Sequence, residues 1–154
     1  MGYTTSTAKA RKTKWKHSVN DVLTLLNLKR KDIKFLGGGV WGIAYDIPDG
    51  KVLKISALRG EYEAGEFLIG KKSDRIVEVY EVHKVEPNPK DNVEFTKMFY
   101  ITIMEKITPL RENGVVPDMD IQIEEINKEG ERLGIRLHDM QRRNMGWKNG
   151  KLAT

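Results

Sequence analysis

The sequence predicts one α+β domain, in which a five-stranded antiparallel sheet with one helix packed on it is followed by a small helical region. Three observations lead to this prediction. The length of 154 residues suits a single domain. Hydrophobic residues make up 39% of the chain, which is enough to form a core. Short apolar runs with strand character are separated by turn signals, and a longer helical pattern follows the last of them.

Composition excludes several classes of protein. The chain contains no cysteine, which excludes disulfide scaffolds, thiolate metal sites and cysteine nucleophiles. No apolar run approaches the roughly 18 residues that a membrane span needs. No apolar segment follows the basic residues at the start, as it would in a secretory signal. We therefore expect a cytoplasmic protein without a membrane span.

The first 20 residues carry the whole net charge of +5. They contain five basic residues and no acidic one, whereas the rest of the chain holds 22 basic and 22 acidic residues. We expect residues 1–17 to form a basic, flexible, solvated arm and residues 18–154 to form the folded domain; contact of the arm with nucleic acid or an anionic surface is the alternative. We do not expect nucleic acid as a partner on this composition, because a binder usually has a basic face on its folded body as well.

The elements of the sheet follow from local signals. Ser18 can cap a short helix, after which the apolar period changes to that of strands. Pro48-Asp49-Gly50 is expected to be a hairpin turn, since Asp-Gly between two apolar runs is a strong hairpin signal. A short helix is expected over residues 61–70. We expect strands over residues 33–36, 43–47, 51–55, 76–82 and 98–104.

The last third of the chain has one strong helical pattern. Over residues 119–133, Ile121, Ile123 and Ile126 lie on one side, and Gly134 follows as a C-terminal signal. We expect residues 137–150 to form a loop, followed by a short C-terminal stub.

A glycine-rich turn joins the first two predicted strands. Gly37, Gly39 and Gly42 form the pattern G-x-G-x-x-G. In a dinucleotide-binding fold this pattern opens a helix, but here a strand follows, which excludes that fold. Between two strands, glycines allow backbone N–H groups to approach phosphates without interference from a Cβ atom. The alternative is a glycine-rich turn with no ligand.

Lys54 lies in an apolar strand, where its charge needs an acidic partner or a phosphate. Side chains alternate along a strand, so Lys54 and Val52 share one face. The helix that follows offers Glu61, Glu63 and Glu66 as partners. The alternative is that Lys54 lies at a solvated edge and the glutamates are ordinary helix surface.

Asp139 and Asn144 lie five residues apart in the predicted loop. A carboxylate can accept or orient the proton of a hydroxyl group, and an amide oxygen can bind Mg²⁺. The alternative is a polar turn in which Arg142 and Arg143 are solvated.

In this order, the three motifs resemble the signature of the protein kinase-like superfamily over residues 32–152. The resemblance implies a kinase N-lobe at residues 18–107 and a minimal helical C-lobe remnant with the catalytic loop at residues 108–154. It implies ATP and Mg²⁺ as cofactors. The short loop between Asp139 and Asn144 is most similar to those of small bacterial, phage or other atypical kinases.

The resemblance also implies roles for individual residues. Lys54 is similar to the lysine that holds the α- and β-phosphates, with Glu63 as the first choice for its helix partner and Glu66 as the second. Asp139 is similar to the catalytic base, and Asn144 to a metal ligand. The implied nucleotide-binding residues are Gly37, Gly38, Gly39, Gly42, Val52, Lys54, Met104, Glu105 and Ile107.

The chain departs from the family pattern at several positions, among them Leu137 and Gln141, where many members have His and Lys. His138 stands before Asp139 where the family has Arg, and the resemblance ends before Asp-Phe-Gly, whose Asp binds Mg²⁺. We expect a partner chain, a second copy, or a substitute acid such as Asp118 or Asp120 to complete the site. The implied function is phosphoryl transfer from ATP to a protein Ser/Thr hydroxyl. The alternative is an impaired pseudokinase that acts as a protein-interaction module.

Overall fold

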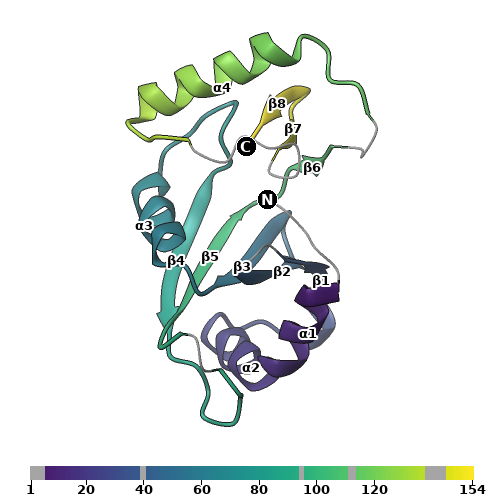
Figure 1. The fold of residues 1–154 in the computed structure, drawn as a ribbon, viewed down its shortest axis with the longest axis vertical. Coiled ribbons are helices and arrows are strands. Elements are labelled where there is room, and N and C mark those ends of the chain that lie inside the picture. The colour runs from purple at the N-terminus through teal and green to yellow at the C-terminus, as the bar shows by residue number, and fades with distance from the viewer. Residues whose placement is uncertain (1–5, 39–40, 94–95, 111–113, 138–144) are drawn as a thin grey trace.

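A five-stranded antiparallel sheet forms the centre of the computed structural model, which describes residues 6–38, 41–93, 96–110, 114–137 and 145–154 (Figure 1). The strand order is β1-β2-β3-β5-β4, so β3 lies in the middle between β2 and β5. This confirms the predicted α+β class and the antiparallel sheet. The strands are β1 (Lys34–Gly37), β2 (Gly42–Ile47), β3 (Lys51–Ser56), β4 (Val79–Val85) and β5 (Phe99–Glu105).

The predicted turn between β2 and β3 is confirmed. Ile47 pairs with Lys51, and Asp49 and Gly50 have φ angles of 70° and 68°, a left-handed conformation that Asp and Gly tolerate well. The strand β4 begins three residues later than expected, because the backbone before it has another partner. Val77 N–H donates to the carbonyl oxygen of Thr154 at 2.9 Å instead of joining β4.

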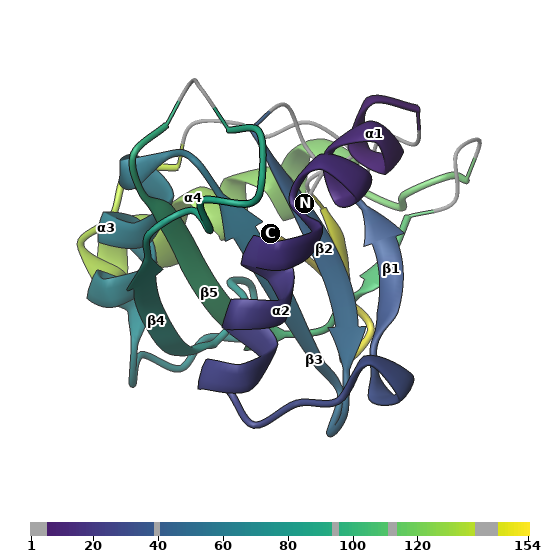
Figure 2. The ribbon, with the colours of Figure 1, turned by 90° about the horizontal axis from the view of Figure 1, so that it is seen from below.

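Two N-terminal helices cover one face of the sheet (Figure 2), so the prediction of a flexible arm over residues 1–17 is wrong for its described part. The helix α1 (Ser6–Lys14) leads through Trp15 into α2 (Lys16–Leu25). Trp15 is only 1% exposed, and its ring centroid lies 4.6 Å from that of Phe99 in β5. Burial of this large aromatic side chain stabilises the segment despite the positive charges around it.

The opposite face of the sheet packs against α3 (Arg59–Leu68). Gly65 lies at the contact, and a Cβ atom built there would lie 3.0 Å from Cγ1 of Val82 in β4. The missing side chain therefore lets the helix approach the strand closely. The sequence predicts one helix packed on the sheet, whereas α1 and α2 also pack on it, against the other face. The described part of the chain has four α-helices and one short 3-10 helix over Arg30–Asp32.

A second, smaller unit follows β5 and contains α4 (Met119–Leu133) and a three-stranded sheet, β6-β7-β8. The bounds of α4 are those predicted, and Gly134 follows with φ 80°. The strands are β6 (Thr108–Pro109), β7 (Gly146–Lys148) and β8 (Lys151–Ala153). The buried members of the core of this unit are Val116, Ile126, Met145 and Leu152.

The hairpin of β7 and β8 corrects the prediction of a loop up to residue 150, because β7 lies within that range. Lys148 pairs with Lys151, and the two residues between them, Asn149 and Gly150, have φ angles of 50° and 79°. Asn-Gly is a strong signal for a two-residue hairpin, so this turn was readable from the sequence. No helix in the described ranges is long and apolar enough to cross a membrane.

Candidate functional site

The sheet face opposite α2 carries an apolar surface beside one cation. Ala44, Val52 and Met104 are buried in one cluster on this face. Ala44 is paired across the strands with Lys54, and Val52 with Met104. Directly paired residues share a face of the sheet, so Lys54 lies at the border of this surface.

The partner of Lys54 is Glu61, in the first turn of α3. The Lys54 ammonium lies 2.7 Å from Oε1 of Glu61, and the two side chains are 21% and 33% exposed. The second oxygen of Glu61, Oε2, is buried and accepts no hydrogen bond from the described residues. A charge pair of this kind holds the lysine in one place and leaves an acceptor on the carboxylate for a further donor.

The prediction that Glu63 is the partner of Lys54 is therefore wrong. Glu63 pairs with Arg59 at 3.1 Å on the exposed side of α3. Glu66, the second choice, is also exposed, and a hydrogen bond with it raises the pKa of Tyr62. Successive helix residues point about 100° apart, so Glu61 and Glu63 point about 200° apart, and Glu61 faces the sheet while Glu63 faces solvent.

The glycine turn packs too closely for side chains at two of its positions. A Cβ atom on Gly38 would lie 2.0 Å from the carbonyl oxygen of Gly42, and one on Gly42 would lie 2.5 Å from that of Ile55. Gly37 has φ 107°, and Gly39 lies outside the described residues. Gly42 is paired with Ser56, two residues beyond Lys54 on β3, so the turn ends close to the cation.

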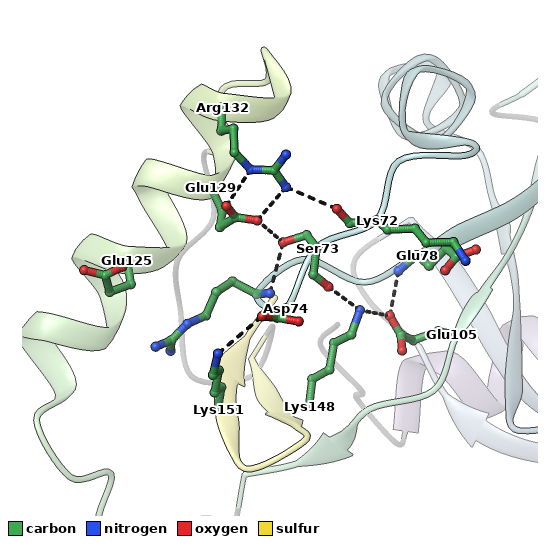
Figure 3. Close-up of a pocket in the computed structure, with 11 residues that line it drawn as sticks. Lys72, Ser73, Asp74, Glu78, Glu105, Glu125, Glu129, Arg132, Lys148 and Lys151 are labelled. Atoms are coloured by element: carbon green, nitrogen blue, oxygen red, sulfur yellow. Dashed lines mark hydrogen bonds and ion pairs between the residues drawn. The ribbon is translucent and has the colours of Figure 1, made fainter.

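The end of β5 lies next to the second unit of the fold. A Cβ atom on Gly146 in β7 would lie 2.4 Å from the carbonyl oxygen of Thr108 and 2.9 Å from Cδ1 of Ile107. Of the predicted nucleotide-binding residues at this end, Met104 is buried in the apolar surface and Ile107 touches β7. The side chain of Glu105 turns away into a polar pocket (Figure 3).

Asp139 and Asn144 lie outside the described residues, but both ends of their loop are described. Leu137 and Met145 pack in the core between α4 and the hairpin, together with Ile126 and Leu152. Met145 immediately precedes Gly146, so the end of the loop lies beside Ile107.

No group of three or more His, Asp or Glu side chains able to hold a metal ion occurs in the described part of the chain. Asp118 and Asp120, proposed as substitute ligands, are exposed at the start of α4.

A polar pocket of about 570 Å³ lies between α4, the segment before β4 and the hairpin (Figure 3). Glu129 of α4 lies 2.7 Å from Nε of Arg132 and accepts a hydrogen bond from the Ser73 hydroxyl at 2.5 Å. Arg132, and then Ser73, lower the pKa of Glu129 to about 2. No sequence motif indicated this network, because its members come from separate segments that only the fold brings together.

No protein-family model and no curated protein sequence matches this chain. The function is therefore inferred from the arrangement of its residues.

Proposed function

We propose that this chain is a kinase-like protein that binds ATP against the sheet face carrying Lys54. The observation that supports this most directly is the ion pair of Lys54 and Glu61, with a separation of 2.7 Å. It holds a cation on the central strand, next to the end of a turn in which Gly38 and Gly42 have no room for a side chain. A fixed ammonium beside closely packed backbone is suited to bind phosphate oxygens.

The surface beside this cation suits a flat apolar ring. Ala44, Val52 and Met104 are buried there, and an adenine base would lie against them. Its hydrogen-bonding edge would be the backbone carbonyl oxygen of Glu105 and the backbone of Ile107, since the N–H of Glu105 donates to Glu78. Gly37, Gly38 and Gly42 would then lie over the phosphates. Small-molecule sites commonly combine such an apolar wall with a few fixed polar groups.

In the proposed reaction a Ser or Thr hydroxyl oxygen of a protein attacks the γ-phosphorus, and the bond from that phosphorus to the leaving oxygen of ADP breaks. Asp139 accepts the hydroxyl proton. Mg²⁺ supplies charge neutralisation at the phosphates in such reactions, and Asn144 is the candidate ligand for it.

A second proposal is a pseudokinase that binds nucleotide and acts through protein contact. The observation that favours it is exposed apolar surface at and before the start of α4. Val115 and Ile121 are 89% and 60% exposed, and exposed apolar groups of this kind are often covered by a partner protein. The partner is then a different chain or a second copy of this one.

Transfer of labelled γ-phosphate from Mg·ATP to the protein and to a basic protein substrate distinguishes the two proposals. Transfer that is abolished by both Lys54→Ala and Asp139→Ala supports the kinase. Binding of ATP, measured by calorimetry, without transfer supports the pseudokinase. If the unchanged chain neither binds ATP nor transfers phosphate, both proposals are wrong.

A further inference from the structure

The basic helix α1 touches the glycine turn directly. The guanidinium of Arg11 donates a hydrogen bond from Nη1 to the carbonyl oxygen of Gly42 at 3.1 Å, across 31 residues of sequence. Arg11 is half-buried in this position, and desolvation lowers the pKa of its guanidinium. Arginine stays protonated under all ordinary conditions, so the hydrogen bond is charge-assisted.

The helix that carries Arg11 has a firm attachment to the sheet. Trp15, at its end, is buried against Phe99. The carboxylate of Asp91, from the loop between β4 and β5, accepts hydrogen bonds from the backbone N–H groups of His17 at 3.0 Å and Ser18 at 2.5 Å. Asp91 thus caps the start of α2 from a distant part of the chain. These contacts hold α1 in place at its C-terminal end.

A second residue of α1 holds the other side of the turn. The Lys12 ammonium lies 5.0 Å from the ring centroid of Phe35 in β1. Arg11 binds the first residue of β2, and Lys12 binds β1, so consecutive residues of one helix contact both strands that the glycine turn joins.

The oxygen that Arg11 binds also limits the position of the turn itself. The carbonyl oxygen of Gly42 is the atom that a Cβ on Gly38 would meet at 2.0 Å. Gly38 and Gly42 therefore pack against each other without spare room, and a shift of the Gly42 peptide requires a shift of Gly38. A hydrogen bond at this oxygen restrains both ends of the turn.

We propose that α1 is a brace that positions the glycine turn, with Arg11 as the positioning residue. The brace acts on the outer side of the sheet, opposite the face that carries Lys54. Its effect on phosphate binding rests on the proposed function, whereas its effect on the turn does not. Because preorganised backbone binds a ligand with less loss of entropy, the brace favours ligands that carry phosphates.

The test compares Arg11→Ala with Lys14→Ala, which removes the same charge from an exposed position of the same helix. Hydrogen exchange measured by mass spectrometry reports on the backbone of the free protein. In Arg11→Ala we expect exchange over residues 41–45 to rise about tenfold, the value of one charge-assisted hydrogen bond, with exchange in β5 unchanged. Lys14→Ala should leave both regions as in the unchanged protein.

Calorimetric titration with ATP and with adenosine tests the consequence for the ligand. Arg11→Ala should weaken ATP binding several-fold and leave adenosine binding unchanged, since adenosine does not reach the turn. Arg11→Lys, which keeps the charge and one donor, should recover part of the ATP affinity.

Two results overturn the brace. One is unchanged exchange over residues 41–45 in Arg11→Ala. The other is an equal rise throughout the sheet, which indicates that α1 only covers the core. If the unchanged protein binds no ATP but Arg11→Ala raises exchange at the turn alone, the proposed function is wrong and the brace is supported.

Discussion

The ammonium of Lys148 in β7 lies 2.6 Å from Oε1 of Glu105, at the end of β5, and only 13% of the Lys148 side chain is exposed. The same ammonium also donates to the backbone carbonyl oxygens of Ser73 at 2.6 Å and Ile76 at 3.3 Å, so its three donors are all used. Glu105 Oε1 in turn accepts the backbone N–H of Glu78 at 2.8 Å. One lysine thus joins the hairpin to two segments of the main sheet unit (Figure 3).

We predict that Lys148→Met lowers the free energy of unfolding by about 2–3 kcal/mol, because it leaves the Glu105 carboxylate largely buried without its partner. Lys151→Met is the matched control. Its ion pair with Asp74 is exposed, so its loss should cost less than about 1 kcal/mol. Urea denaturation followed by circular dichroism measures both values, and equal effects of the two substitutions contradict the prediction.

We predict that Glu61→Gln weakens the proposed binding of ATP about tenfold, which is the value of one charge-assisted hydrogen bond. The substitution removes the charge that holds the Lys54 ammonium in place. Glu63→Gln, two residues further along α3, removes only an exposed pair with Arg59 and should leave the affinity unchanged. Calorimetric titration measures both. A larger effect from Glu63→Gln would show that the pairing in solution is the one expected from the sequence.

The low pKa of Glu129 predicts acid-sensitive packing of α4. The hydrogen bonds from Arg132 and Ser73 lower the pKa of its carboxylate to about 2 in the folded protein, below the usual value of roughly 4.3 in an unfolded chain. The folded state therefore gains stability from this group above about pH 4.5, and loses it as the pH falls toward about 2. In Glu129→Gln the free energy of unfolding should depend less on pH over this range. Denaturation at a series of pH values measures it. Glu131→Gln, on the exposed surface of α4, should retain the profile of the unchanged protein.

We predict that Trp15→Ala destabilises the protein by about 3–5 kcal/mol, as expected when a buried Trp is truncated and leaves a cavity. Trp41 is 48% exposed, so Trp41→Ala should cost less than about 1 kcal/mol. Chemical denaturation gives both values. A negligible effect of Trp15→Ala would mean that the N-terminal segment does not pack on the sheet.

The local elements were predictable because their signals lie within a few residues of each other. The turn at Asp49-Gly50 combines the two residue types that tolerate a positive φ angle. The helix over residues 119–133 combines an apolar face with a terminal glycine, Gly134, and the structure has the same bounds. The Asn149-Gly150 turn carried an equally local signal.

The N-terminal helices and the Lys54 partner were not predictable in the same way. Five positive charges indicated a solvated arm. The segment is nevertheless ordered, because Trp15 packs against Phe99, which lies 84 residues away in the sequence. Three glutamates in one short helix were equivalent candidates for Lys54. Only the rotation of α3 about its axis, set by packing at Gly65 against Val82, selects Glu61.

By itself, the sequence determined the α+β class, the order of the strands along the chain, and the placement of a glycine turn and a lysine near one sheet face. The tertiary structure alone decided which groups pair with each other: Arg11 with Gly42, Glu61 with Lys54, and Lys148 with Glu105. The physical reason is the distance along the sequence over which each effect acts. Backbone periodicity and turn chemistry act over a few residues, whereas the partner of a buried charge is whichever group the packed core brings within hydrogen-bond distance.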